Sequence, residues 1–165
     1  MILSNYAFSR RISLIKKYLN KSDKILDFGA GSGRYTEALK KEGFDIKSLD
    51  INSKFKPDIV ADGKKTGLPD NSFDKIIAIE VLEHGFFYDE IIRLLKPSGY
   101  LICSVPSPST EWLLNILIAL KLVNDKVTPH VNLHFLKENK FKKIKLIEFK
   151  FLFFGMTQFG VFKKL

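Results

Sequence analysis

Three glycines at alternate positions, Gly29, Gly31 and Gly33, follow a short apolar run that contains Asp27. Glycine tolerates positive φ and lets a ligand approach the main chain, and a helix that starts there presents unpaired N–H groups. This combination is typical of a turn that holds a nucleotide-like cofactor, and a purely structural turn is the alternative. A dinucleotide fingerprint needs G-x-G-x-x-G, whereas the third glycine here comes one residue early and Arg34 stands in its place. The spacing therefore argues against a dinucleotide.

Three acids downstream stand where short apolar runs end. Asp50 follows the run 44–49, Asp62 follows 57–61, and Glu80 follows 76–79. In a doubly wound sheet the carboxyl ends of the strands line the ligand crevice, and an acid about 20 residues past the glycine turn can accept both ribose hydroxyls. Asp50 has that position. The alternative is an ordinary strand-end acid that caps the next turn.

The pattern Asp-x-Gly-x-Gly-x-Gly of residues 27–33 resembles motif I of the class I S-adenosylmethionine-dependent methyltransferases. The later motifs follow in the order typical of the small-molecule, type 11-like branch of that family. They are Asp62, Leu68-Pro69, Ser72-Phe73-Asp74, Glu80-Val81-Leu82-Glu83-His84 and Leu94-Leu95-Lys96-Pro97-Ser98-Gly99. The family usually has glycine where this chain has Ser98, which is a mild departure. The resemblance covers residues 25–106.

The resemblance implies S-adenosyl-L-methionine as cofactor, with S-adenosyl-L-homocysteine as product. It also implies that Asp62 reaches the adenine amino group and that Glu80 lies beside the methionine end. The expected cofactor contacts are Asp27, Gly29, Gly31, Gly33, Asp50, Ile51, Asp62, Gly63 and Glu80. Methyl transfer from a sulfonium is an in-line displacement, so the protein mainly positions reactants, excludes water and sometimes removes a proton.

Histidines are the candidates for that proton transfer. His84 follows the fourth expected strand and could act as a base or orient an acceptor hydroxyl, with helix capping or packing as the alternative. His130 lies in a segment that resembles the family's segment after its variable insertion, so it is expected to face the substrate. His130 and His134 have metal-ligand spacing on a helix, but no Glu completes H-E-x-x-H, and we predict no metal site.

Short β runs alternate with helical stretches over residues 24–105, which indicates parallel strands joined by helices. Two further β runs, 141–154 and 158–163, predict a hairpin at the sheet edge. The resemblance implies a single-domain Rossmann-like α/β fold with helices on both faces and seven strands ordered 3-2-1-4-5-7-6, the last antiparallel. The link after Asp50 is short and contains Pro57, so its usual helix is expected to be missing. An N-terminal helix carrying Tyr6 and Arg10 is expected to cover the cofactor or to pack on the surface.

Composition sets the broad class. At 165 residues and 45% hydrophobic content, the chain is expected to form one domain over residues 1–165. Its one cysteine, Cys103, is expected to be a small core residue and excludes a disulfide framework within the chain. Basic residues interrupt the N-terminal apolar residues, so a signal peptide is not expected, and no apolar stretch is long enough for a bilayer. A cytoplasmic protein is the expectation.

The formal net charge of +9 favours anionic partners, but 23 of the 27 basic residues are lysines, as on ordinary solubilising surfaces. The leading hypothesis is a methyltransferase that acts on a small-molecule acceptor, apolar or anionic. An RNA methyltransferase and a non-catalytic cofactor-binding partner subunit are the alternatives, and nucleic acid is not favoured. The nearly apolar helix expected over 111–123 could be core, a homodimer contact or part of an apolar substrate pocket. The acceptor and its reacting atom are not identified.

Overall fold

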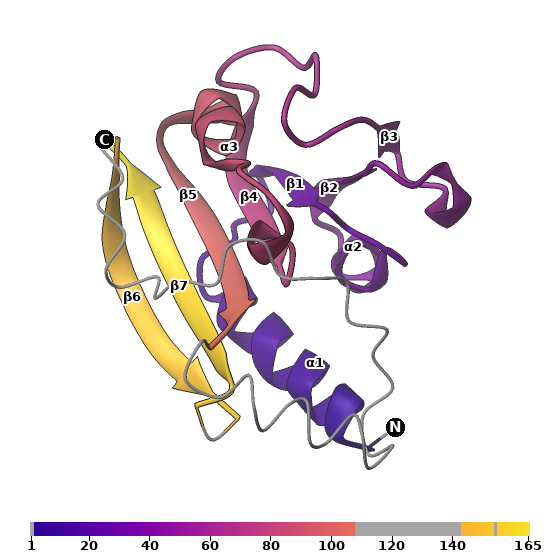
Figure 1. The fold of residues 1–165 in the computed structure, drawn as a ribbon, viewed down its shortest axis with the longest axis vertical. Helices are drawn as coiled ribbons and strands as arrows, with labels where there is room; N and C mark the ends of the chain where they lie inside the picture. Colours follow the sequence, from indigo (N-terminus) through magenta and orange to yellow (C-terminus); the bar gives the residue numbers. More distant parts are fainter. Residues whose placement is uncertain (1, 108–142, 154) are drawn as a thin grey trace.

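The computed structural model describes residues 2–107, 143–153 and 155–165. This part of the chain forms one seven-stranded sheet with helices against it (Figure 1). The strands are β1 (Lys24–Phe28), β2 (Asp45–Asp50), β3 (Ile59–Val60), β4 (Phe73–Ile79), β5 (Leu95–Pro106), β6 (Ile144–Leu152) and β7 (Thr157–Lys164). The helices are α1 (Ile2–Lys16), α2 (Arg34–Lys41) and α3 (Tyr88–Leu94), with short 3-10 helices η1 (Ser53–Phe55) and η2 (Leu82–His84).

The strand order is β3-β2-β1-β4-β5-β7-β6, as the resemblance implied. The first five strands pair in parallel, with Ile25 of β1 aligned to Ile46 of β2 on one side and to Lys75 of β4 on the other. Strand β7 runs antiparallel to both β5 and β6, so the predicted edge hairpin is confirmed. Parallel strands with one orientation bring all their carboxyl ends to a single edge of the sheet, where ligands bind in such folds.

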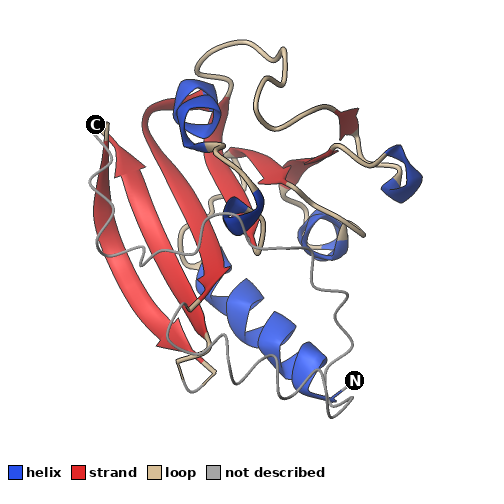
Figure 2. Cartoon of the chain, in the orientation of Figure 1, coloured by secondary structure: helices blue, strands red, loops and turns tan. Residues whose placement is uncertain are grey.

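Side chains that alternate along the strands enter two separate apolar layers. Leu26 and Phe28 of β1 pack with α3 on one face, whereas Ile25 packs with α1 and α2 on the other face. Helices therefore cover both faces of the sheet, as expected (Figure 2). The predicted core role of Cys103 is confirmed, because its side chain is fully buried in the α3 layer. Since successive strand residues face opposite layers, both layers together fix the register of each strand.

The connection from β2 to β3 contains only η1, so the expected loss of a full helix there is confirmed. Its anchor is Asp58, whose Oδ2 accepts hydrogen bonds from the Ser48 N–H at 2.7 Å and the Ser48 hydroxyl at 2.8 Å. The same oxygen pairs with Lys40 Nζ of α2 at 2.9 Å. These bonds hold the short link against β2 and α2 without a crossover helix.

Strand β5 begins earlier than expected. The fifth strand was expected after a turn at Ser98 and Gly99, but β5 begins at Leu95 and contains that turn as an irregularity, with Ser98 at φ +62°.

The expected helix over 111–123, and with it the predicted dimer contact or substrate pocket, lies outside the described residues, as do His130 and His134. Across residues 2–107, 143–153 and 155–165, no helix combines the length and the apolar character needed to cross a bilayer.

Candidate functional site

The glycine turn lies between the end of β2 and the end of β4. The N–H groups of Gly29 and Ala30 both donate to the Leu49 carbonyl, at 2.8 and 2.9 Å. Gly29 has φ +71°, and a Cβ there would lie 2.3 Å from Cγ2 of Val81, the residue after Glu80. A Cβ on Gly31 or Gly33 would meet nothing within 4 Å. The turn is therefore packed against β2 and Val81 at its start and open at its later glycines, which leaves room for a ligand beside the main chain.

Asp50 is held against this turn. Its Oδ2 accepts a hydrogen bond from the Gly31 N–H at 2.8 Å, and its Oδ1 accepts one from the Asn52 N–H at 2.8 Å. The carboxyl group is half-buried at the end of β2. The structure thus brings together the two features that the spacing singled out, the glycine turn and the acid 19 residues further along.

Asp27 lies underneath the turn and is 2% exposed. Its Oδ2 accepts hydrogen bonds from the Thr36 hydroxyl at 2.7 Å and from the Thr36 N–H at 3.2 Å. Burial raises the pKa of Asp27 to about 6, against the lowering effect of the Thr36 hydrogen bonds, and the nearby charge of Asp50 adds to the rise. Asp27 therefore ties the end of β1 to the first turn of α2 and faces the protein interior.

The third acid, Asp62, follows β3 and is exposed. Its Oδ1 accepts a hydrogen bond from the Lys64 N–H at 2.9 Å. A Cβ on the adjacent Gly63 would lie 2.7 Å from Cζ of Phe28 and 3.1 Å from Cδ1 of Phe87, so that glycine is needed for close packing. Ile51, directly after Asp50, is 67% exposed. Ile51 and Asp62, both predicted cofactor contacts, therefore lie on the accessible surface.

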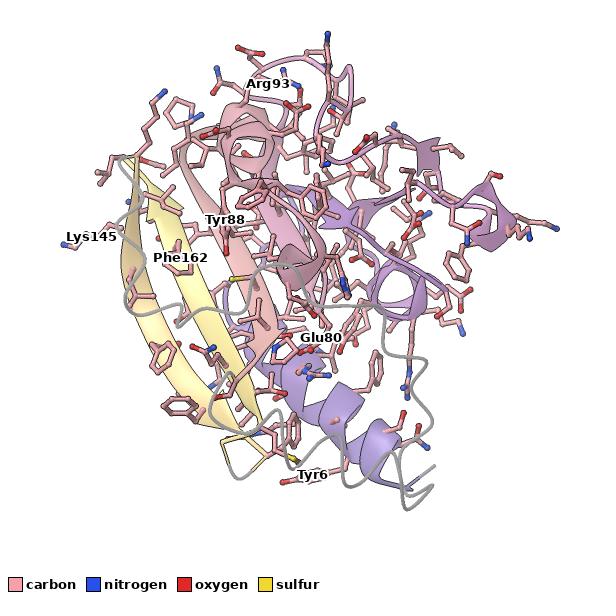
Figure 3. All side chains as sticks on the ribbon, in the orientation of Figure 1. Tyr6, Glu80, Tyr88, Arg93, Lys145 and Phe162 are labelled. Atoms are coloured by element: carbon pink, nitrogen blue, oxygen red, sulfur yellow. The ribbon has the colours of Figure 1, made fainter. Side chains whose placement is uncertain are left out.

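Glu80 stands at the centre of a polar cluster after β4. Its Oε1 accepts hydrogen bonds from Arg11 Nη2 of α1 at 2.8 Å and from the Ser104 hydroxyl of β5 at 2.8 Å. Arg11 Nη2 also donates to the Thr157 hydroxyl of β7 at 3.2 Å. Figure 3 shows Glu80 beside α1. The Glu80 backbone has φ +53°, a conformation that a non-glycine residue adopts at some cost and that clusters at functional sites.

Sequence reasoning missed Arg11 and singled out its neighbour Arg10, which is exposed. Tyr6, also singled out, is 63% exposed and makes an edge contact with Phe153 at 6.1 Å between ring centroids. The Arg11 guanidinium lies 5.3 Å from the centroid of the same ring. Helical periodicity could have distinguished Arg11 from Arg10. Arg11 lies three and four residues before Leu14 and Ile15, so it shares the buried face of the helix with them.

The segment after Glu80 places Glu83 inside the protein and His84 near its surface. Glu83 is 1% exposed, and its Oε2 has no hydrogen-bond partner among the described residues. Burial first, and then the charge of Glu80, raises the pKa of Glu83 to about 8, opposed by its own backbone and by Arg11. His84 Nε2 lies 3.9 Å from Glu83 Oε1. His84 thus ends η2, the element that follows β4, and a chemical role for it stays a prediction.

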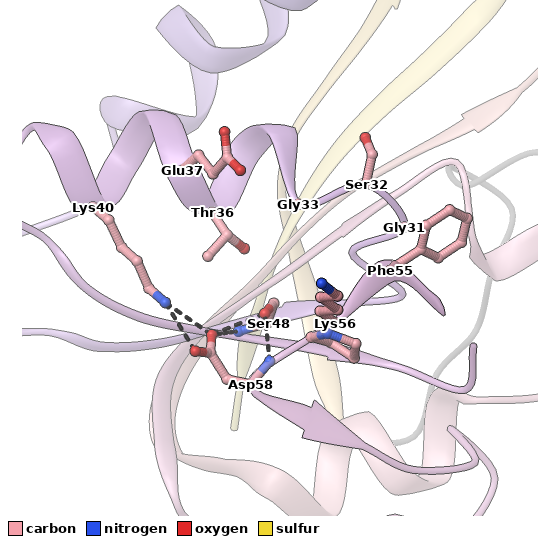
Figure 4. Close-up of a pocket in the computed structure, with 11 residues that line it drawn as sticks. Gly31, Ser32, Gly33, Thr36, Glu37, Lys40, Ser48, Phe55, Lys56 and Asp58 are labelled. Atoms are coloured by element: carbon pink, nitrogen blue, oxygen red, sulfur yellow. Dashed lines mark hydrogen bonds and ion pairs between the residues drawn. The ribbon is translucent and has the colours of Figure 1, made fainter. Parts of the chain in front are cut away.

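A pocket of about 160 Å³ opens on the far side of the glycine turn, between α2 and the β2–β3 link (Figure 4). It is lined by Gly31, Ser32, Gly33, Thr36, Glu37, Lys40, Ser48, Phe55, Lys56, Pro57 and Asp58. It shares two glycines with the predicted site but none of its acids, Asp50, Asp62 or Glu80. Because the link has no crossover helix, the flank of α2 is left open there. This pocket is therefore a consequence of the short link, and the predicted site lies along the strand ends.

Relatives with similar sequences were found among characterised and uncharacterised proteins. The chain is 36% identical over 118 residues to an uncharacterised protein of Methanocaldococcus jannaschii, and the matched region covers 63% of this chain and 52% of that protein. It is 32% identical over 123 residues to a sterol 24-C-methyltransferase of Gibberella zeae, and the matched region covers 56% of this chain and 32% of that protein. The chain thus spans about half or less of the length of these curated relatives.

Solved structures share the fold at lower identity. A S-adenosylmethionine-dependent methyltransferase of Methanosarcina mazei has a TM-score of 0.70 and 20% identity, covering 92% of this chain and 97% of that one. A 1,6-didemethyltoxoflavin-N1-methyltransferase of Burkholderia thailandensis, with its substrate and S-adenosylhomocysteine bound, has a TM-score of 0.64 and 14% identity over 99% of this chain and 85% of that one. Residues 4–144 match the family described as "Methyltransferase domain". The family and the fold implied by the resemblance are confirmed, and the chain belongs to the methyltransferase domain family.

Proposed function

We propose that this chain, as one methyltransferase domain over residues 1–165, transfers a methyl group from S-adenosylmethionine to a small-molecule acceptor by in-line displacement. The observation that supports the proposal is the hydrogen bond between Asp50 and the Gly31 N–H, because it joins the glycine turn to the acid that we propose binds the ribose. The sterol and toxoflavin methyltransferases among the similar proteins, which act on small molecules by their names, support the acceptor class.

The described residues fit such a donor. The open space at Gly31 and Gly33 admits a ligand beside the main chain, and the half-buried Asp50 carboxylate can exchange its backbone donors for ribose hydroxyls. Asp62 would accept from the adenine amino group, and the exposed Ile51 would cover the adenine face. Glu80 would lie on the methionine side, next to the packed start of the turn at Gly29 and Val81.

The bound donor supplies an electrophilic methyl group on a sulfonium. The protein then has to align the acceptor behind that methyl group and keep water away. The rigid contacts of the turn, with Gly29 and Ala30 fixed to β2 and Gly29 against Val81, serve the alignment. His84, next to the end of β4, is the residue we propose to orient the acceptor or take its proton. His130, the other candidate, lies outside the described residues.

Calorimetry tests the donor site. Titration of the whole chain with S-adenosylmethionine and S-adenosylhomocysteine should give saturable binding of both, and no binding at millimolar ligand would refute the proposal. Asp50→Ala should weaken both affinities by about 10- to 100-fold, since a charge-assisted hydrogen bond is worth about 1.5–3 kcal/mol. Asp45→Asn, at the opposite end of the same strand and exposed, should leave both affinities unchanged. Equal changes of affinity in the two variants would show that Asp50 does not contact the donor.

A turnover assay separates the rival functions. Release of S-adenosylhomocysteine should be measured with the isolated chain against fractionated metabolite pools and against RNA. A product in a metabolite fraction is the expected result. Methyl incorporation into RNA would favour the nucleic-acid alternative instead. Donor binding without turnover, together with a second chain that co-purifies, would favour the non-catalytic subunit.

A further inference from the structure

Glu83, a buried acid beside the predicted donor site, has no role in the proposed methyl transfer. Glu83 lies on η2, three residues after Glu80, and is 1% exposed. Its Oε2 has no hydrogen-bond partner among the described residues. A buried polar atom without a partner costs stability, so such an atom beside a predicted ligand site invites a ligand-linked explanation.

The charges around Glu83 come from several elements. Glu80 follows β4, Arg11 faces it from α1, Cys103 from β5, and His84 stands next to it on η2 with Nε2 3.9 Å from Glu83 Oε1. Arg11 and Glu80 form a 2.8 Å ion pair, so their charges offset one another. Burial raises the pKa of the Cys103 thiol, which keeps that group neutral. The net charge of Arg11, Glu80 and Glu83 near neutral pH therefore depends on Glu83.

This cluster adjoins the glycine turn. Val81, between Glu80 and Glu83, is the residue that Gly29 packs against, so the turn and the two acids belong to one contiguous structure. Under the proposed function, the methionine part of the donor lies at Glu80. The donor carries a positive sulfonium there, whereas the product carries a neutral thioether, and the two are otherwise the same in charge. The sulfonium is thus the group that a net negative charge at this place would recognise.

We propose that Glu83 is a specificity-determining residue that ionises when the sulfonium donor binds and stays protonated when the thioether product binds. In the free protein the carboxyl is neutral, and Arg11 with Glu80 adds no net charge. When the donor binds, the O–H bond of the carboxyl breaks and its proton passes to the solvent buffer. The resulting carboxylate balances the sulfonium in a site of low dielectric, where such pairing is strong. The product offers no charge to drive this step, so its binding gains no such pairing and releases no proton.

The inference rests on the proposed donor site, and the wild-type chain tests it first. Titrations of each ligand at about pH 7, in two buffers with different heats of ionisation, measure the protons released on binding. We expect close to one proton for S-adenosylmethionine and close to none for S-adenosylhomocysteine. The ratio of donor to product affinity should rise about tenfold from about pH 6 to about pH 7, because one proton is linked to donor binding alone. Equal proton release for the two ligands overturns the inference.

Glu83→Gln tests the assignment to this residue, with the exposed Glu42→Gln as control. The Glu83 variant should lose the proton release and the pH dependence of the affinity ratio, and the control should keep both. A Glu83 variant that behaves like wild type overturns the inference and leaves the proposed function standing. If wild type binds neither ligand, the proposed function fails and the inference fails with it. Circular dichroism checks that the variant folds, and if it does not, the wild-type proton count decides.

Discussion

Asp27 and Asp50 are both acids at the end of a parallel strand, but their surroundings differ. Asp50 is half-buried and bonded to main-chain N–H groups at the open turn, whereas Asp27 is 2% exposed and bonded to Thr36. The spacing of the motif singles out both residues, and only the structure shows that Asp50 lies at the open turn and that Asp27 faces the interior. We therefore expect Asp27 to affect donor binding only through the shape of the turn.

The burial of Asp27 leads to a pH-dependent stability. Its pKa is about 6 in the folded chain and about 3.8 in the unfolded chain, so the folded state holds the proton to higher pH. The free energy of unfolding should therefore fall as pH rises, by up to about 3 kcal/mol from this group between about pH 4 and pH 7. Asp27→Asn should remove that component, which urea unfolding at several pH values measures. A variant with the wild-type slope over this window would contradict the assigned pKa.

The residues that sequence reasoning missed are those whose partners are distant along the chain. Arg11 is 69 residues from Glu80 and 146 from Thr157, and Ser104 is 24 residues from Glu80. Glu83 stands within a quoted motif, but its burial depends on how η2 packs against β5. A motif reports residues close in sequence, so it found the glycine turn and the strand-end acids and could not find this cluster.

At the scale of elements, Arg11 makes a polar attachment of α1 to the sheet. Arg11 joins α1 to the ends of β4 and β7, and its side chain is 15% exposed. Leu14 and Ile15 supply the apolar contact one turn further along. Because the same arginine pairs with Glu80, the position of α1 and the geometry of the predicted site are coupled.

Removal of this arginine should loosen α1 more than removal of its neighbour. We expect Arg11→Ala to lower the free energy of unfolding by about 2–3 kcal/mol, since it leaves the partly buried Glu80 without its cation. Arg10→Ala, on the exposed side of the same helix, should change it by less than about 0.5 kcal/mol. Hydrogen exchange should also show faster exchange in α1 for the Arg11 variant. Similar losses for the two variants would show that the Arg11 pair does not hold the helix.

The short β2–β3 link depends on Asp58, whose carboxylate is bonded to Ser48 of β2 and Lys40 of α2. Burial alone would raise its pKa, but hydrogen bonds from Ser48 and Lys40 outweigh it and hold the pKa at about 2. The bonds therefore stabilise the link above the unfolded pKa near 4, and this contribution is lost as pH falls toward 2. Asp58→Asn should destabilise the chain at neutral pH and weaken its acid dependence, as urea unfolding would show. Equal acid sensitivity in variant and wild type would mean that the link is held otherwise.

At the scale of the whole molecule, the strand order could be predicted only through the resemblance to class I methyltransferases, which rests on an ordered series of motifs. The local patterns by themselves indicated parallel strands joined by helices and a hairpin at the sheet edge. A short third strand was predicted, but its two-residue length and the irregular start of β5 could not be derived from local patterns. Those features depend on pairing with neighbouring strands, which the chain's own periodicity does not report.

The net charge of +9 belongs to the whole chain and allows a last test of the RNA alternative. Lysines predominate over arginines by 23 to 4, and arginine is the residue suited to planar, bidentate phosphate contacts. We therefore expect weak, non-specific RNA binding through diffuse charge. Its affinity should fall more than about tenfold between about 50 and 200 mM salt, because condensed counterions are released on binding.

Donor binding should respond differently to the same change of salt, because it depends on short hydrogen bonds to Asp50 and the turn rather than on diffuse charge. We expect the affinity for S-adenosylmethionine to change by less than about twofold over that range. Fluorescence anisotropy with a labelled RNA and calorimetry with the donor measure the two responses on one preparation. RNA binding that stays tight at the higher salt, and that strengthens when the donor is present, would couple the two sites. That coupling would make RNA the better candidate for the acceptor.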